Sequence, residues 1–364
     1  MKVMLKELGE IITGNTPSKQ IEEFWNSEDI CFIKPDVIAD SGVNEISESN
    51  EYISEGARNK ARVVSKNAIF VTCIGSIGKI GIAMDGEYAF NQQINAIIPN
   101  EKIDSKYLAY NLLFNKQRLI GMANAPVVPI INKSQFGEFT LNIEIDSDKQ
   151  SEIVKVLDKL MDIIKHRKNE LFALDALIKA RFVEMFGDQE YEKKRLIELI
   201  QEGAGLSYGI VVPGDNVKDG IPMIRPSDFK NGSLSLDNVY RVASEIECKY
   251  KKTRLFGDEI LVQVIGQPGQ VMLSNERCKG MNVTRNLAVI RIDKDKANRL
   301  FISHYLSTEE AQFFMFGSTN QSTLKQLPLN KLKELPIPIV PVSKQNQFAD
   351  FVNQVDKSKF MKSF

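Results

Sequence analysis

Two kinds of hydrophobic pattern alternate along this chain. From residue 1 to about 147, short runs of β-branched and aromatic residues stand between turn-forming residues, as in Ala68–Ile74, which Gly75–Gly78 follows. Such runs predict strands, and the glycines predict tight hairpin turns rather than a phosphate-binding loop. From about residue 148 the apolar positions recur in alternating steps of four and three. This spacing predicts one long helix with a heptad seam.

The first pattern then returns. Leu5 recurs 191 residues later as Leu196, and further residues recur at the same separation. Most of these repeats lie in blocks of Gly, Pro, Asn and β-branched residues, where backbone geometry constrains sequence most. A separation of this length predicts duplicated domains rather than a solenoid. We expect two copies of one mainly β domain with short helices, over 1–147 and 188–342. The same constant separation pairs Gly14 with Gly205, Ile33 with Ile224, Pro35 with Pro226, Ile69 with Ile260, Asn91 with Asn282, and Asn95 with Asn286.

Each copy ends in a helix of one design. The long central helix is expected over 148–187 and a shorter one over 343–364, where Lys344-Gln345 matches Lys149-Gln150. An antiparallel coiled coil would bury both seams and give the α+β chain a pseudo-two-fold symmetry; in the alternative, each helix packs on its own domain. The predicted seam residues are Ile153, Leu157, Leu160, Ile164, Leu171, Leu174, Ile178, Phe348, Val352 and Val355.

Composition narrows the choice of partners. The chain is globular in type, with 43% hydrophobic and 26% charged residues, and its formal net charge is zero. Any nucleic-acid binding must therefore come from local basic patches. The chain has no apolar run long enough to span a membrane and no positively charged leader, so we expect a cytoplasmic protein without a membrane partner. Four cysteines without a CxxC spacing predict reduced, idle thiols.

Motifs of catalysis are absent from the sequence. It has no GxGxxG, GxxxxGK[ST], HExxH or GxSxG, and no Asn/Asp-Pro-Pro-aromatic site of a DNA aminomethyltransferase. The two histidines, His166 and His304, lack partners at ligand spacing, and Glu192-Lys193-Lys194 is best interpreted as a solvated charge run. The sequence therefore predicts a non-catalytic chain that binds no metal or cofactor itself.

Basic and amide residues recur in place. Lys34 before Pro35 matches Arg225 before Pro226, and the cluster around Arg58 overlaps that around Lys251. Such clusters are either solvated surface or a face for a polyanion such as double-stranded DNA. Amides and arginines at loop tips are able to read base edges, although they are also ordinary turn residues. The candidate DNA-binding residues are Asn15, Thr16, Ser18, Lys19, Lys34, Arg58, Lys60, Arg62, Lys79, Asn91, Gln92, Gln93, Arg225, Lys249, Lys251, Gln267, Gln270, Thr284, Arg285, Thr319 and Asn320.

The order of these blocks resembles the specificity subunits of type I restriction-modification systems. The resemblance covers essentially the whole chain. It is carried by TGNTPS (13–18), IKPDVI (33–38), NQQ (91–93), RFVEMFGD (181–188), GIPMIRPSDF (220–229), GSTNQSTLKQL (317–327) and LPIPIVPVSKQNQF (335–348).

The resemblance implies two target-recognition domains, each reading one half of a bipartite DNA site. It also implies helices that act as a ruler and bind two methyltransferase subunits, with restriction subunits joining the complex. S-adenosylmethionine, ATP and Mg would belong to those partners. The shorter second helix departs from the family pattern. The rival hypothesis is a coiled-coil scaffold that displays two β-rich protein-interaction modules.

Overall fold

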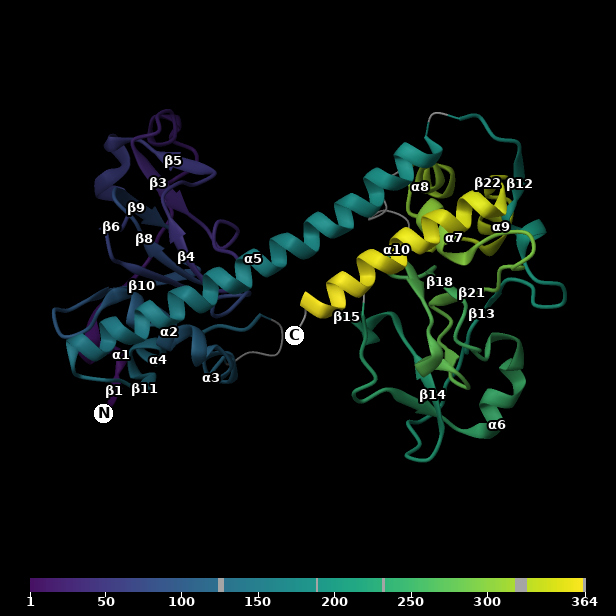
Figure 1. Ribbon diagram of the computed structural model, residues 1–364. Helices are drawn as coiled ribbons and strands as arrows, with labels where there is room; N and C mark the ends of the chain where they lie inside the picture. Colours follow the sequence, from purple (N-terminus) through teal and green to yellow (C-terminus); the bar gives the residue numbers. More distant parts are fainter. Residues whose placement is uncertain (124–127, 188, 231–232, 318–325, 363–364) are drawn as a thin grey trace. The chain divides into compact units, whose positions relative to one another are not determined.

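The computed structural model describes the chain except residues 124–127, 188, 231–232, 318–325 and 363–364. Two compact units, Met1–His166 and Arg167–Phe364, divide it. Each unit holds one mainly β copy of the repeated domain (Figure 1). The predicted α+β class is confirmed.

The first copy is built on two sheets. The larger has the order β2-β10-β7-β8-β4 and the smaller the order β5-β3-β9-β6. Helices cover the outer face of the larger sheet, and short 3-10 turns cover the smaller one. The larger sheet consists of β2 (Gly9–Thr13), β4 (Val43–Ile46), β7 (Ile69–Thr72), β8 (Ile80–Ala83) and β10 (Ile94–Pro99), and the smaller of β3 (Ile30–Ile33), β5 (Glu51–Ile53), β6 (Val63–Ser65) and β9 (Glu87–Phe90). The helices are α1 (Leu5–Leu8), α2 (Ser105–Phe114), α3 (Lys116–Gly121) and α4 (Lys133–Glu138), and the turns are η1 (Glu22–Phe24) and η2 (Glu55–Lys60).

Alternation along β7 divides the apolar core into two layers. Phe70 packs edge-on against Tyr88 and Phe90, in the layer that the two sheets share. Its neighbours Ile69 and Val71 lie in a second cluster with residues of α2 and α4. Because side chains on a strand alternate between faces, one β-branched run fills both layers. All four residues of β7 are buried, as expected for a strand covered on both faces.

The second copy repeats this plan with shorter strands. Its main sheet has the order β13-β21-β18-β19, beside a three-stranded sheet of order β17-β14-β20. Here α7 and α8 take the places of α2 and α3. The strands are β13 (Ser207–Tyr208), β14 (Ile221–Ile224), β15 (Phe229–Lys230), β16 (Ser233–Leu234), β17 (Tyr240–Val242), β18 (Ile260–Gln263), β19 (Val271–Leu273), β20 (Asn282–Val283) and β21 (Leu287–Ile290). The helices and turns are η3 (Leu196–Leu199), η4 (Pro226–Asp228), α6 (Ser244–Glu247), η5 (Cys248–Thr253), η6 (Glu276–Cys278), α7 (Arg299–Leu306), α8 (Glu309–Phe316) and α9 (Leu329–Lys333).

A short strand pair closes each copy where the chain enters and leaves it. In the first copy β1 (Lys2–Met4) pairs antiparallel with β11 (Thr140–Asn142). In the second, β12 (Lys193–Arg195) pairs with β22 (Pro336–Pro338) in the same way. The ends of each copy therefore lie side by side.

Matching backbone hydrogen bonds define which residues of the two copies correspond. The amide of Gly14 donates to Ile94, and that of Gly209 donates to Leu287; the amides of Asn91 and Thr284 donate to Ile33 and Ile224. The constant separation of 191 residues therefore holds for residues 2–8, whose counterparts are 193–199, for β3/β14 and for the β7–β8 hairpin, but not for β2, β9 or β10. Gly14 corresponds to Gly209 rather than Gly205, and Asn91 to Thr284 rather than Asn282. Insertions in the loops shift these strands, and the repeated Asn identities are coincidental.

The long central helix is α5 (Ser147–Phe186), and the C-terminal helix is α10 (Val342–Lys362). Phe182 and Phe186 contact Phe348 near the start of α10, whereas Asp175 pairs with Lys359 near its end. The two helices are therefore antiparallel over this stretch, as predicted (Figure 1). Ile178, Phe348, Val352 and Val355 are buried there, and Leu171 and Leu174 are half-buried.

The first part of α5 differs from the prediction. Val154 packs against the core of the first copy, and Asp158 accepts a hydrogen bond from Tyr110, so one side of the helix lies on its own domain. The predicted seam residues Ile153, Leu160 and Ile164 remain 39%, 49% and 45% exposed, and Leu157 is half-buried. Both sequence hypotheses thus hold, each for one part of α5.

A buried glutamine joins each helix to its copy. The side-chain oxygen of Gln150 accepts from the amide of Asp104, the N-cap of α2, at 2.8 Å. Gln345 accepts in the same way from Asn298, the N-cap of α7, also at 2.8 Å. Both glutamines are almost fully buried. Their repetition in the sequence therefore has a structural reason.

Candidate nucleic-acid interface

Polar side chains of three segments meet at one tip of the first copy. The hydroxyl of Thr16 donates to the side-chain oxygen of Gln92 at 2.8 Å, and the side-chain amide of Asn15 donates to the carbonyl of Lys60 at 2.6 Å. Thr16, Gln92 and Lys60 are exposed. Gly14 lets these segments approach, because a Cβ there would lie 2.3 Å from the carbonyl oxygen of Asn91. The structure thus brings together four residues predicted from sequence, which we call the first tip.

The corresponding tip of the second copy has different chemistry. Val211 follows Ile210, whose amide donates to Val283, and Arg285 donates its own amide to the carbonyl of Ile210. Val211 is 45% exposed, the adjacent Val212 is 70% exposed, and Arg285 is exposed. Arg285 makes no side-chain hydrogen bond or ion pair with the described residues. Sequence analysis did not single out the two valines, because no spacing or motif marks them as exposed.

Several of the cations predicted to bind DNA form ion pairs with carboxylates of the same chain. Lys34 and Lys19 both pair with Glu51, and Arg225 pairs with Asp228 at 2.8 Å. Burial raises the pKa of Glu51, but Lys34 and then Lys19 bring it below its ordinary value. The recurring Lys34 and Arg225 are thus parts of local ion pairs.

Two further predicted cations have structural contacts. Arg58 bonds to Glu87 and Glu55, whose carboxylates, Glu87 first, raise the pKa of its guanidinium. Lys79 donates to the carbonyl of Pro35 at 3.1 Å and pairs with Asp40, and its side chain is 14% exposed. Neither cation is well placed to meet a phosphate.

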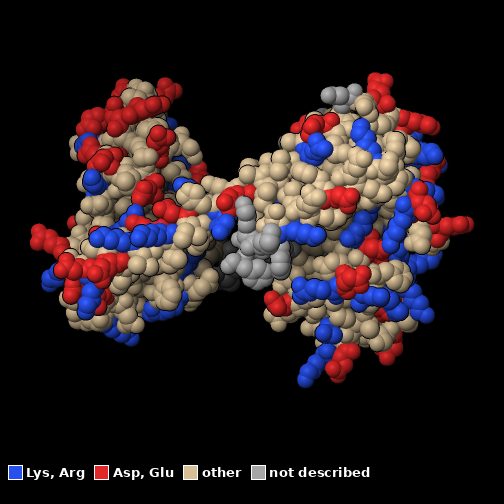
Figure 2. Space-filling model, viewed as in Figure 1, with Lys and Arg blue, Asp and Glu red and all other residues tan. Residues whose placement is uncertain are grey.

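Carboxylates also gather at one end of the first copy. Figure 2 shows them concentrated around β3 and β5, where Glu22, Glu23, Glu28, Asp29 and Glu48 are exposed. Negative charge of this density repels a polyanion. Lys19, which also lies over the Trp25 ring at 5.1 Å, belongs to this end. A nucleic acid would therefore meet the first copy elsewhere.

The remaining predicted residues fall into three groups. Lys60, Arg62, Lys249 and Lys251 are exposed and form no ion pair with the described residues. Other polar candidates are held by neighbours: Asn91 by Gln93, Gln267 by Gln270, Ser18 by the amide of Gln20, and Thr284 by a backbone bridge to Ile210. Thr319 and Asn320 lie outside the described residues.

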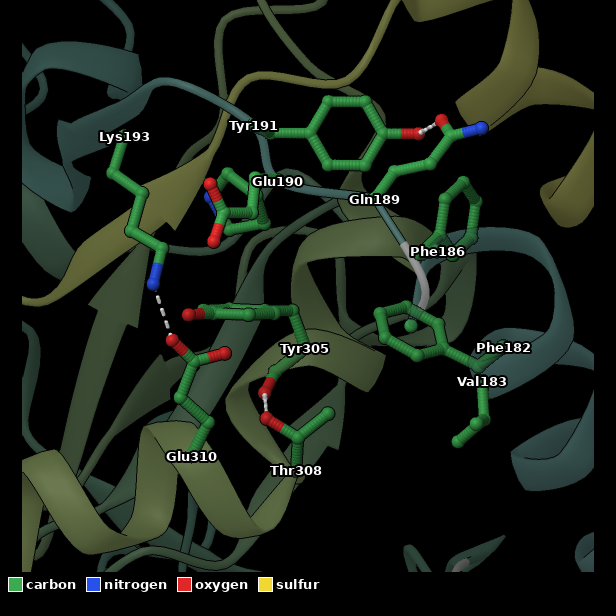
Figure 3. A pocket seen from close by; sticks show the side chains of 12 residues that line it. Phe182, Val183, Phe186, Gln189, Glu190, Tyr191, Lys193, Tyr305, Thr308 and Glu310 are labelled. Atoms are coloured by element: carbon green, nitrogen blue, oxygen red, sulfur yellow. Dashed lines mark hydrogen bonds and ion pairs between the residues drawn. The ribbon is translucent and has the colours of Figure 1, made fainter.

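An aromatic cavity of about 390 Å³ lies where the end of α5 meets the second copy. Phe182, Phe186, Tyr191 and Tyr305 line it, and Lys193 donates to Glu310 at its rim (Figure 3). Among its polar groups, Lys193 bonds to Glu310, and the hydroxyls of Tyr191 and Thr308 donate to the side chain of Gln189 and to the carbonyl of Tyr305. The geometry gives this cavity a packing role at the joint of helix and domain.

Other classes of site find little support among the described residues. No three His, Cys, Asp or Glu side chains gather as a metal site there. Burial raises the pKa of the Cys73 thiol to about 12, which keeps it protonated. No described helix has the length and apolar character needed to cross a membrane.

The chain thus carries a duplicated mainly β module whose tips expose dissimilar side chains, and a long helix connects the two copies. The model of the type I restriction modification DNA specificity domain matches residues 1–173 and 190–362. The chain therefore belongs to this family, whose members recognise DNA targets.

Relatives and solved structures agree with this assignment. The chain is similar to the type I restriction enzyme EcoBI specificity subunit of Escherichia coli, with 28% identity over 46% of the chain and 35% of that protein. It is also similar to the MjaIX specificity subunit of Methanocaldococcus jannaschii, with 29% identity over 51% of the chain and 43% of the relative. The chain thus matches less than half the length of either relative. A solved S subunit from M. genitalium has the same fold, with a TM-score of 0.52 at 13% identity, covering 100% of this chain and 91% of that chain.

Proposed function

We propose that this chain is the non-catalytic DNA-recognition subunit of a type I restriction-modification complex, in which each copy reads one half of a bipartite, gapped site. One observation carries the proposal. The two copies keep the same backbone hydrogen bonds around Gly14 and Gly209, yet expose different side chains at the tips those bonds support. A shared frame with different exposed chemistry is what two unlike half-sites require.

Phosphate contacts would come from those predicted cations that are exposed and form no ion pair in the described parts of the chain, apart from Arg285 at the second tip. These are Lys60, Arg62, Lys249 and Lys251. If about four cations neutralise phosphates, the logarithm of affinity falls with the logarithm of salt concentration at a slope of about −3 to −4. Local clusters of this kind allow DNA binding by a chain of zero net charge.

Partner subunits would dock on the helices. Ile153, Leu160 and Ile164 form an apolar stripe on α5 with Val156 and Ile163, which are 58% and 57% exposed. A stripe of this kind on a helix marks a protein-binding face. We assign it to methyltransferase subunits, two in the complex, with restriction subunits joining through them. S-adenosylmethionine, ATP and Mg would be bound by those partners.

Binding to DNA tests the recognition role. The chain, purified with its methyltransferase partner, is expected to select one asymmetric, gapped sequence from random duplexes, with the salt slope given above. Lys249→Gln with Lys251→Gln should weaken all sequences alike and reduce the slope by about two. The control is Lys294→Gln, because this lysine already pairs with Asp258. Equal affinity for scrambled DNA would contradict the proposal and favour the protein-interaction scaffold.

The ruler role has a separate test. Four residues, about one turn or roughly 6 Å, are inserted into both α5 and α10 within their paired stretch. The preferred gap between half-sites is expected to change, while the half-sites stay the same. Altered half-sites with an unchanged gap would refute the ruler.

A further inference from the structure

The two tips occupy the same position in the two copies. Four pairs of backbone hydrogen bonds establish this: Gly14 to Ile94 and Gly209 to Leu287, Asn15 to Phe90 and Ile210 to Val283, Asn91 to Ile33 and Thr284 to Ile224, and Ile94 to Asn91 and Leu287 to Thr284. In this register Thr16 corresponds to Val211, and Gln92 corresponds to Arg285. Neither correspondence follows from the constant separation seen in the sequence.

At the first tip the amide of Gln92 is oriented. The hydroxyl of Thr16 donates to its side-chain oxygen, which keeps one lone pair, while both N–H groups remain free to donate. A side chain with one acceptor and one donor side by side matches the N6 and N7 edge of adenine in the major groove. Thr16 would hold the amide in the orientation that this pairing needs.

At the second tip the side chains of Arg285, Val211 and Val212 carry no hydrogen-bond acceptor. Arg285 offers only donors, in a planar fork that matches the O6 and N7 acceptors of guanine. Beside it, Val211 and Val212 expose methyl groups to solvent, which costs free energy unless another surface covers them. In the major groove the methyl group of thymine provides such a surface.

We propose that these two pairs are the specificity determinants of the chain: Thr16 and Gln92 read an adenine in one half-site, and Arg285 with Val211 reads a guanine beside a thymine in the other. The inference rests on the proposed function, since it names the base chemistry that each copy recognises. Loss of a bidentate base contact lowers affinity for the matching base roughly 5- to 150-fold.

Exchange of the two pairs tests this assignment. One variant carries Thr16→Val and Gln92→Arg, and another carries Val211→Thr and Arg285→Gln, each purified with the methyltransferase partner. The probe is a pool of random duplexes, and the selected sequences are read out. The first variant should change adenine to guanine at one position of one half-site, and the second should change guanine to adenine in the other half-site.

The controls are charge changes elsewhere on the same copies. Gln117→Arg and Arg277→Gln alter exposed side chains away from the tips and should leave the selected sequence unchanged. If the wild-type complex selects a gapped site and both exchange variants select that same site, this inference is overturned and the proposed function stands. If the wild-type complex selects no sequence, the proposed function itself fails.

Discussion

The two copies stabilise the same strand ends by different chemistry. In the first copy, Ala68 and Ala83 face each other across β7 and β8, and the amide of Ala83 donates to the carbonyl of Ala68 at 2.8 Å. In the second copy, Glu259 and Ser274 take these places with the same backbone bond at 3.0 Å. Arg291 stands where the first copy has Ile98. One backbone frame therefore accepts either an apolar or an ionic filling.

The ionic filling of the second copy is fully bonded. Arg291 bonds to Glu259 at 3.1 Å and donates to the carbonyls of Lys252 and Arg254, while Ser274 donates to Glu259 at 2.7 Å. The network thus ties the main sheet to the segment that carries the basic cluster around Lys251. A buried ion pair adds little net stability, but loss of one partner is costly. The second copy therefore differs from the first in that hydrogen bonds from the buried Arg291 fix its basic segment, Lys252 to Arg254, to the main sheet.

The largest expected effect comes from breaking this network. Arg291→Ala leaves the buried Glu259 carboxylate without its cation and should destabilise the second copy by about 3 to 5 kcal/mol. Urea denaturation followed by far-UV circular dichroism should show an early transition that fluorescence of Trp25, the single tryptophan, which lies in the first copy, does not report. The control is Ile98→Ala, which should lower stability only slightly because Ile98 is 37% exposed. Unchanged circular dichroism for Arg291→Ala would contradict the comparison.

Acid sensitivity should also separate the copies. His304, packed between Phe182 and Phe348, corresponds by its place after the helix N-cap to Tyr110 in the first copy. Burial lowers its pKa to about 4, from an ordinary value of 6.5. The unfolded chain therefore binds this proton first, so stability falls as pH drops from about 6.5 to 4, by at most about 3 kcal/mol.

The matched variants are His304→Tyr, which introduces the residue of the first copy, and His166→Gln, which changes an exposed histidine. Urea midpoints measured at pH 7 and pH 4.5 should lie closer together for His304→Tyr than for the wild type. His166→Gln should behave as the wild type. An equal pH dependence in all three proteins would show that His304 does not titrate in this way.

A smaller effect is expected where the copies agree. Gln150→Ala and Gln345→Ala each leave a buried N-cap amide without its acceptor, at a cost of about 1 to 3 kcal/mol. The first should lower the transition seen by Trp25 fluorescence, and the second should lower the transition seen only by circular dichroism. Lys149→Ala, an exposed neighbour, is the control. A strong difference between the two losses of stability would show that Gln150 and Gln345 do not play equivalent roles in the two copies.

The smallest effect on stability is predicted when the apolar residues of the first copy replace the whole ionic network of the second. The triple variant Glu259→Ala, Ser274→Ala, Arg291→Ile removes the whole network and introduces the residues of the first copy. Because all partners leave together, stability should stay within about 1 kcal/mol of the wild type or rise. Denaturation by urea checks this. A loss as large as that of Arg291→Ala alone would mean that the network has a role beyond satisfying its own charges.

The repeated frame was visible in the sequence because it depends on local chemistry. Glycines with positive φ recur in the hairpins, at Gly75 and Gly78 and again at Gly266 and Gly269, and such positions tolerate few other residues. The seam of α10 was predictable from heptad spacing. These features need no knowledge of distant contacts.

Features that depend on distant contacts were not predictable. Lys34 pairs with Glu51, and Arg58 pairs with Glu87. These partners lie on other strands, and no spacing rule identifies them from the sequence. Loop insertions displaced the correspondence of Gln92 from Val283 to Arg285, which only the strand register reveals. Exposure of Ile153 on the central helix likewise depends on what the helix packs against.

The strand pairs β1–β11 and β12–β22 have a consequence for how such chains diversify. Since the chain leaves each copy beside the point where it arrived, the loops between can lengthen or change without moving the attachment to the helix. Replacement of an entire copy by a foreign one preserves the joint as long as the buried glutamine and its N-cap partner are kept. New combinations of tips are therefore accessible by exchange of whole gene segments, without the many coordinated substitutions that rebuilding a tip would need.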